Sequence, residues 1–223
     1  MGKKIAYLHT VASLVDLFNR LSKEILPPET EVMHIADEML LHTVLAAGKP
    51  TPFAYRRVGQ HVRAAEEAGA DLIQLTCSSI SECAEPARSM VAIPVLTVDE
   101  PMVDRALELG QAIGVAATAP TTLRPTAELV RKRAAQLGKQ VNVEVALCPG
   151  AYAALFAGDR EKHDIIVRRT LRELVSRNEV VLLAQASMAR VLESIPPEEL
   201  YVPVLTSPRL AVERAATLLQ VTT

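Results

Sequence analysis

Short apolar runs alternate with longer stretches of helical periodicity along the chain. The apolar runs predict strands at residues 4–10, 31–36, 71–76, 93–98, 112–118, 141–147, 179–185 and 201–207. The longer stretches between them predict helices, among them 12–26, 53–68, 122–137, 160–177 and 208–220. Strands that are apolar on both faces and separated by helices are typical of parallel βαβ units covered on both sides. The pattern therefore predicts an α/β fold.

The second half of the chain repeats the first. A shift of 108 residues places Ile113 on Ile5 and Gln185 on Cys77, and a shift of 109 places "VPVLTSPRLAVERA" on "IPVLTVDEPMVDRA". We therefore expect a duplication of two pseudo-symmetric halves, each a four-stranded parallel sheet flanked by helices, at residues 1–98 and 99–207. A C-terminal helix at about 208–223 is free to pack back on the first half. Two unrelated halves of similar periodicity are the alternative.

Composition excludes several classes of protein. Hydrophobic residues make up 49% of the chain and charged residues 22%, which is enough to bury a large core. Aromatic residues make up 3% and the net charge is −2, so we expect no nucleic-acid partner. The N-terminal stretch is apolar as in a signal peptide, but Asp16 and Asn19 interrupt it. No apolar run is long enough to cross a membrane. Three cysteines without tight spacing predict neither a metal site nor a disulfide framework, which favours a cytoplasmic protein.

Polar residues follow most of the predicted strands, where open parallel sheets bind their ligands. In the first half they are His9, Thr10, Asp37, Glu38, Cys77–Ser79, Asp99 and Glu100, and in the second Thr118–Thr122, Cys148, Gln185–Ser187, Thr206 and Ser207. Two facing sheets would bring both sets to one cleft. Hydroxyls, backbone amides and helix N-termini suit a small anion. The first strand is followed by "LHTVAS", without the glycines of a dinucleotide or P-loop site.

Cys77 is the clearest candidate for a catalytic residue. It lies between a strand end and a predicted helix start at Ser78–Ser79, where a helix dipole would lower the thiol pKa from about 8.5. Such a thiol can exchange a proton with carbon or attack carbon, although a buried structural cysteine fits the position equally well. Cys83 is expected in the core. Cys148 fits either the core or the wall of the cleft.

Three segments together resemble the aspartate/glutamate racemase superfamily, namely "ADLIQLTCSSI", "GVAATAPTT" and "VVLLAQASMARV". Its members include aspartate, glutamate and hydantoin racemases, maleate isomerase and arylmalonate decarboxylase. The resemblance implies two Rossmann-like halves with the active site in the cleft between them. It also implies no metal, no other cofactor, and a homodimer or higher homo-oligomer.

The resemblance also assigns roles to individual residues. Cys77 matches the first of two thiols that exchange the α-proton from opposite faces, and Gln185 occupies the place of the second. The residues matched to, or expected in, substrate binding are His9, Thr10, Ser78, Ser79, Thr118, Thr121, Thr122, Ala186 and Ser187. Because an amide does not shuttle protons, Gln185 departs from the two-thiol pattern unless Cys148, His9 or water replaces the missing acid.

The sequence thus predicts a cofactor-independent racemase or isomerase acting at the carbon next to the carboxylate of a small substrate. Cys77 would be its acid, base or nucleophile. One alternative is a single-cysteine decarboxylase of an arylmalonate-type substrate. Another is a non-catalytic protein that binds a small carboxylate.

Overall fold

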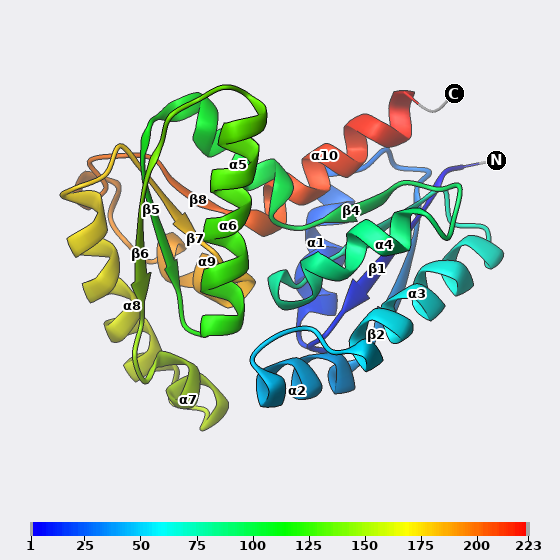
Figure 1. Ribbon diagram of the computed structural model, residues 1–223, viewed down its shortest axis with the longest axis horizontal. Coiled ribbons are helices and arrows are strands. Elements are labelled where there is room, and N and C mark those ends of the chain that lie inside the picture. Colours follow the sequence, from blue (N-terminus) through cyan, green and yellow to red (C-terminus); the bar gives the residue numbers. More distant parts are fainter. Residues whose placement is uncertain (1, 222–223) are drawn as a thin grey trace. The chain divides into compact units, whose positions relative to one another are not determined.

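The computed structural model describes residues 2–221 and contains two separate parallel sheets (Figure 1). The chain divides into two compact units. Unit 1 consists of the residues up to Glu100 together with those from Pro208 onwards, and unit 2 runs from Pro101 to Ser207. The C-terminal helix thus belongs to the unit that the N-terminus begins.

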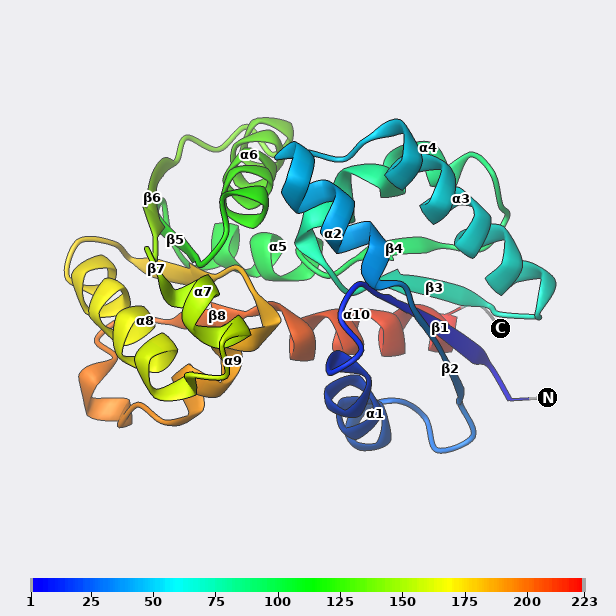
Figure 2. The same cartoon turned by 90° about the horizontal axis from the view of Figure 1, so that it is seen from below.

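Unit 1 is a four-stranded sheet in the order β2-β1-β3-β4, with every neighbouring pair parallel. Its strands are β1 (Lys4–His9), β2 (Glu31–Ala36), β3 (Leu72–Leu75) and β4 (Val95–Thr97). Its helices are α1 (Leu14–Ile25), α2 (Glu38–Ala47), α3 (Pro52–Glu67), the 3₁₀ helix η1 (Ser78–Cys83), α4 (Ala84–Arg88) and α10 (Ser207–Val221). Helices α1 and α10 cover one face of the sheet, and α3 and α4 cover the other (Figure 2).

Unit 2 repeats this arrangement in the order β6-β5-β7-β8, again all parallel. Its strands are β5 (Ala112–Ala117), β6 (Asn142–Leu147), β7 (Val180–Leu183) and β8 (Val204–Thr206). Its helices are α5 (Glu100–Leu109), α6 (Pro120–Gln136), α7 (Ala151–Phe156), α8 (Arg160–Val175), α9 (Ala186–Glu193) and the 3₁₀ helix η2 (Pro197–Glu199). Helices α6 and α8 lie on opposite faces of this sheet (Figure 1).

The two sheets share more than their strand order. In unit 1 Ile5 pairs with Leu72, and in unit 2 Ile113 pairs with Val180, which are the same positions after the shift of 108. The strands β1, β3, β5 and β7 are almost wholly buried, as continuous apolar runs require when helices cover both faces. The prediction of an α/β fold with two four-stranded parallel halves is confirmed.

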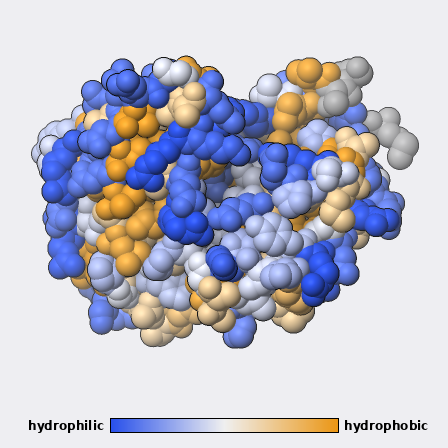
Figure 3. All heavy atoms as spheres, viewed as in Figure 1, coloured by the Kyte–Doolittle hydropathy of each residue, from blue (hydrophilic) through white to orange (hydrophobic). Residues whose placement is uncertain are grey.

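One edge of unit 2 carries apolar side chains on its surface. Strand β6 pairs only with β5, and Val145 and Leu147 on it are 49% and 38% exposed. Figure 3 shows apolar atoms gathered where β6 lies. Among the helices that the structure describes, none has the length and apolar character needed to cross a bilayer.

Candidate functional site

Cys77 lies at the carboxyl edge of the unit 1 sheet. The Thr76 backbone N–H still donates to Leu8 O in the neighbouring strand, over 3.0 Å, and Cys77 is the extended residue that follows. The next residues turn immediately into η1, with the N–H of Ile80 donating to Cys77 O over 3.2 Å. The thiol is therefore fixed by a strand end on one side and a tight turn on the other. Its side chain is partly exposed, whereas Cys83 and Cys148 are buried.

The electrostatic setting of Cys77 differs from the one expected from sequence. Burial raises the pKa of the thiol above its usual value, and the nearby Asp99 carboxylate raises it further. The facing Thr10 hydroxyl and the Ser79 N–H and hydroxyl act in the opposite direction but do not outweigh burial. The expected lowering by a helix dipole is wrong. The residues after Cys77 form a six-residue 3₁₀ turn and a five-residue α-helix, which are too short to build a strong dipole.

A buried carboxylate, that of Asp99, lies near the thiol and binds the serines that follow it. Asp99, directly after β4 and Val98, accepts hydrogen bonds from Ser78 Oγ over 2.5 Å and from Ser81 Oγ over 2.7 Å. The side chain is 1% exposed, and burial raises its pKa to about 6 in spite of the two serine hydrogen bonds. Ser78 is thus oriented by Asp99, because its hydroxyl proton points at the carboxylate. In the sequence Asp99 stands out only as a strand-end residue, and nothing local pairs it with serines about 20 positions earlier.

Thr10 supplies an unsatisfied hydroxyl at the same edge. It follows β1, the strand next to β3, and is 1% exposed. Although it faces the Cys77 thiol, Thr10 Oγ1 makes no hydrogen bond of good geometry with any group in the described part of the chain. Native proteins rarely leave a buried hydroxyl unsatisfied. A ligand oxygen beside Cys77 would satisfy it.

His9 takes part in a chain of hydrogen bonds below this edge. Its Nε2 lies 2.9 Å from His34 Nδ1, His34 Nε2 lies 3.0 Å from Asn19 Oδ1, and His9 Nδ1 lies 2.8 Å from Thr76 Oγ1. Which ring nitrogens donate and which accept along this chain depends on the tautomers of the two histidines. Burial and the facing His34 lower the pKa of His9 to about 4, and burial also lowers that of His34.

The expectation that His9 contacts substrate is therefore not supported by its bonding. Both ring nitrogens are already hydrogen-bonded within unit 1, and the side chain is fully buried. Its position at a strand end is as predicted, but the neighbouring strand β2 places His34 directly beside it. His9 holds Thr76, the residue before the thiol, and neither nitrogen is left for a ligand.

The matching edge of unit 2 carries an amide in place of a thiol. Gln185 follows β7, and its Oε1 accepts from the Thr118 backbone N–H over 2.5 Å and from Thr118 Oγ1 over 2.8 Å. A backbone N–H can only donate, so the amide oxygen faces Thr118 and the amide nitrogen points away. Among the described residues, no group bonds that nitrogen. Gln185 thus offers hydrogen-bond donors but no exchangeable acid.

The other residues expected in the second half lie on the same edge. Ala186 and Ser187 are the first residues of α9. Thr121 and Thr122 are buried in the first turn of α6, and both have further interactions within the protein. The unit 2 loops therefore place hydroxyls and helix N-termini at its carboxyl edge, as the sequence predicted for Thr118, Thr121, Thr122 and Ser187.

The remaining cysteines belong to the two cores. Cys83 packs among the residues between the unit 1 sheet and α3, and Cys148 packs beneath α8 in unit 2. Both are at most 1% exposed, and burial raises the pKa of each thiol, that of Cys83 to about 12. Cys148 is therefore a core residue and does not replace the missing second acid.

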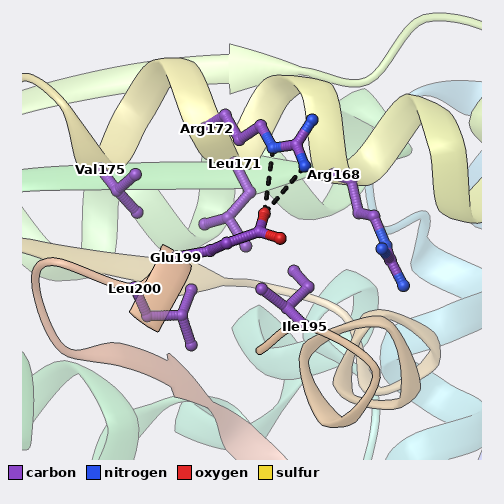
Figure 4. A pocket seen from close by; sticks show the side chains of 7 residues that line it. All are labelled: Arg168, Leu171, Arg172, Val175, Ile195, Glu199 and Leu200. Atoms are coloured by element: carbon purple, nitrogen blue, oxygen red, sulfur yellow. Dashed lines mark hydrogen bonds and ion pairs between the residues drawn. The ribbon is translucent and has the colours of Figure 1, made fainter. Parts of the chain in front are cut away.

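A small cavity in unit 2 lies away from these residues. It is formed by Arg168, Leu171, Arg172, Val175, Ile195, Glu199 and Leu200 (Figure 4). The segment 195–200 leads into β8, so the cavity lies toward the amino edge of the sheet, opposite Gln185. An ion pair of 2.8 Å between Arg172 and Glu199 closes one side, and the volume of about 10 Å³ admits about one water. In the described part of the chain, no group of histidines, cysteines and carboxylates is arranged to hold a metal ion.

The chain is similar to known proteins over nearly its whole length. The family model for the Asp/Glu/hydantoin racemases matches residues 8–215. Among solved structures, an allantoin racemase from Klebsiella pneumoniae has a TM-score of 0.73 at 19% identity, over 99% of this chain and 89% of the other. A glutamate racemase from Francisella tularensis, solved with D-glutamate, has a TM-score of 0.74 at 16% identity, over 98% and 81%.

An aspartate racemase homologue from Pyrococcus horikoshii is also similar. It has a TM-score of 0.68 at 17% identity, over 98% of this chain and 99% of that one. The comparison with curated protein sequences gave no match.

Proposed function

The chain belongs to the Asp/Glu/hydantoin racemase family, and we propose that it is a cofactor-independent racemase or isomerase. Its substrate is a small carboxylate, and the reaction takes place at the carbon next to the carboxyl group. Cys77 is the acid and base. Thr10, Ser79 and the Asp99-oriented Ser78 bind the substrate around it.

The observation that carries this proposal is the pairing of a partly exposed thiol with an unsatisfied buried hydroxyl. Cys77 and Thr10 face one another at the ends of adjacent strands, and the thiol also receives the Ser79 backbone N–H. Thr10 is one of several described residues with a buried polar side-chain atom that lacks a partner, and its hydroxyl faces the thiol. Donors of this kind stabilise the negative charge that develops on a carboxylate when its α-carbon loses a proton.

In the proposed reaction the Cys77 thiolate removes the α-proton, and the electron pair moves into the carboxylate to form an enediolate. Hydrogen bonds from Thr10 and the Ser79 N–H stabilise the oxygens, and a proton then returns to carbon. We propose that Gln185, through its amide nitrogen, is a hydrogen-bond donor and not an acid. Water replaces the second thiol as the proton source, because the amide of Gln185 cannot supply one, and the hydroxide that forms takes the proton back from Cys77.

A second reaction is favoured by one specific observation. Burial raises the pKa of Cys77, which favours the protonated thiol, and Gln185 has neither an acid nor a base in its side chain. This state suits a decarboxylase. Carbon dioxide leaves a malonate-type substrate, and the electrons of the broken carbon–carbon bond form the enolate. The thiol proton then passes to the α-carbon. Water then reprotonates the thiolate, so that one acid suffices.

The test is proton exchange in D₂O with amino acids, hydantoins, 2-hydroxy acids and substituted malonates, followed by NMR at the α-carbon. We expect exchange that is lost in Cys77→Ser and retained in Cys83→Ala, which removes a thiol from the core instead. Inversion together with exchange identifies a racemase. Deuterium incorporation only with release of carbon dioxide identifies the decarboxylase. Binding of carboxylates without any exchange or decarboxylation would instead show a binding protein.

We also propose a cytoplasmic homodimer. All three cysteines are free, as is usual in a reducing compartment. The exposed apolar side chains on the edge strand β6 are of the kind that proteins normally cover by association. Val145 and Leu147 are accordingly the residues that a second copy of the chain would cover.

A further inference from the structure

Ser78, the residue directly after Cys77, donates its hydroxyl proton to a neighbouring carboxylate. Its Oγ–H donates to Asp99 Oδ1 over 2.5 Å. An ionised carboxylate can only accept hydrogen bonds, and a serine hydroxyl has one proton to donate. As long as Asp99 is ionised, the hydroxyl proton of Ser78 is therefore not available to a ligand that binds beside Cys77.

Asp99 is held in a fixed position and shielded from solvent. The residue is 1% exposed, and its second oxygen, Oδ2, accepts from Ser81 Oγ over 2.7 Å. Both serines belong to η1, the turn that follows Cys77, and Asp99 lies after β4, the strand next to β3. The carboxylate thus links the loop that carries the thiol to the end of the neighbouring strand.

The surroundings of Asp99 favour the uptake of a proton. Burial raises the pKa of Asp99 to about 6, and the Glu100 carboxylate acts in the same direction. Arg88 pairs with Glu100 over 2.9 Å, so its charge is already matched by that carboxylate. Protonation of Asp99 therefore requires only a small change from neutral pH. The titratable groups on the turn and helices around Asp99 are Cys77, Glu82, Cys83, Glu85, Arg88 and Glu100.

Protonation of Asp99 would reverse its hydrogen bond with Ser78. With a proton on Oδ1, the carboxyl group donates to Ser78 Oγ, and the Ser78 hydroxyl proton becomes available to a ligand oxygen. The contact between the two side chains is kept, because a hydroxyl can accept as well as donate. A carboxylate that binds beside Cys77 then gains one hydrogen-bond donor.

We propose that Asp99 is a positioning residue that couples substrate binding to proton uptake through Ser78. When the substrate carboxylate binds beside Cys77, Asp99 takes up one proton from solvent, and Ser78 turns its hydroxyl proton from Asp99 to the substrate. This inference rests on the proposed function of Cys77 and adds the pH dependence of binding. The donors of Thr10 and Ser79 do not depend on Asp99, so a carboxylate binds more weakly, but still binds, when Asp99 stays ionised.

The affinity for simple carboxylates as a function of pH tests this coupling. Acetate, glycolate and benzoate are titrated into isotopically labelled protein between about pH 5.5 and about pH 8, and the Kd is obtained from the backbone amide NMR signals of Ser78 and Ser79. The fraction of protein with protonated Asp99 sets the apparent affinity. We expect the Kd to be nearly constant below about pH 6 and to rise by up to about tenfold per pH unit above it.

Calorimetry measures the proton itself. At about pH 7.5 most of the Asp99 carboxyl groups are ionised before the ligand is added. Titrations in buffers of different ionisation enthalpy should therefore show the uptake of close to one proton for each carboxylate bound. Binding without proton uptake would contradict the coupling.

Three variants separate the roles of the groups. Asp99→Asn can donate to Ser78 at any pH through its amide nitrogen, so it should bind at about pH 8 as tightly as wild type does at about pH 5.5, without proton uptake. Ser78→Ala lacks the hydroxyl and should bind weakly at every pH. Asp16→Asn, at an exposed position in α1, should keep the pH dependence of wild type.

The outcomes distinguish this inference from the proposed function. A Kd that is independent of pH, or that changes equally in wild type and Asp99→Asn, would overturn the coupling and leave carboxylate binding at Cys77 in place. A pH dependence that persists in Ser78→Ala would overturn the role of Ser78. Binding of none of the carboxylates at any pH would overturn both proposals. A Kd that rises with pH in wild type and Asp16→Asn, but in neither of the other variants, establishes the coupling.

Discussion

Replacement of Asp99 by asparagine should stabilise the protein in a pH-dependent way. The carboxylate is 1% exposed and accepts hydrogen bonds from Ser78 and Ser81. An asparagine of the same shape can accept from one serine through its oxygen and donate to the other through its nitrogen, since a hydroxyl serves both roles. The substitution therefore removes a buried charge and keeps both contacts.

The magnitude follows from the pKa of Asp99. Burial raises it from 3.8 to about 6, so ionisation of this carboxyl is harder in the folded protein than in the unfolded chain. A difference of about two pKa units corresponds to about 3 kcal/mol. The sign follows from proton linkage. Below about pH 4 both states are protonated and the cost is absent, and above about pH 6 it is complete. A neutral asparagine avoids this cost, so Asp99→Asn should be about 3 kcal/mol more stable than wild type at pH 7 and nearly equal to it at pH 4.

Urea unfolding of both proteins between pH 4 and pH 7 measures this difference. Every other titratable group is present in both proteins, so its contribution cancels in the comparison. Asp16→Asn, at an exposed position in α1, serves as the control for the loss of one acidic side chain. A difference between Asp99→Asn and wild type that is flat, or that falls as the pH rises, would refute the idea that Asp99 is a costly buried charge.

Three further predictions concern other parts of the molecule. The pKa of the His9 ring, followed by NMR, should be about 4. Because this lies below the value of about 6.5 for an unperturbed histidine, the contribution of neutral His9 to folding stability should be complete above about pH 6.5 and be lost as the pH falls. His34→Gln should raise the pKa of His9, and an unchanged pKa would contradict the pairing of the two rings. Gln185→Cys should raise the ratio of inversion to proton exchange by restoring a second thiol, measured by chiral chromatography; no change would exclude a role for this position in proton return. Val145→Lys should shift a dimer to monomer in light scattering, whereas Ile165→Lys, also exposed at 61%, should not.

The course of the chain after Cys77 illustrates the limit of local patterns. Sequence predicted a helix from Ser78, and the structure has a 3₁₀ turn followed by a short α-helix that contains Pro86. Ser78 and Ser81 bond the distant Asp99 instead of capping a helix. Serine side chains that form hydrogen bonds of this kind favour backbone conformations other than a regular helix. The sequence of the segment does not indicate which residue is the partner.

The helices, the strands and their duplication follow from the linear sequence. Continuous apolar runs, broken by helical periodicity, suffice for parallel strands covered on both faces, and the shift of 108 residues already aligned Cys77 with Gln185. These signals lie in consecutive residues or recur at a fixed spacing, so they can be recognised without the structure. The sequence also placed Cys77, Thr10 and Gln185 at strand ends, because topology alone carries polar residues there.

Tertiary packing sets which groups meet and which charge each of them carries. His34 beside His9, Asp99 beneath Ser78, and Arg57 on Asp37 are contacts between segments with no common sequence pattern. The pKa of Cys77 even moved in the opposite direction to the expected one, because desolvation depends on everything that packs around the thiol. Periodicity is written into consecutive residues, whereas burial and pairing are properties of the folded chain as a whole.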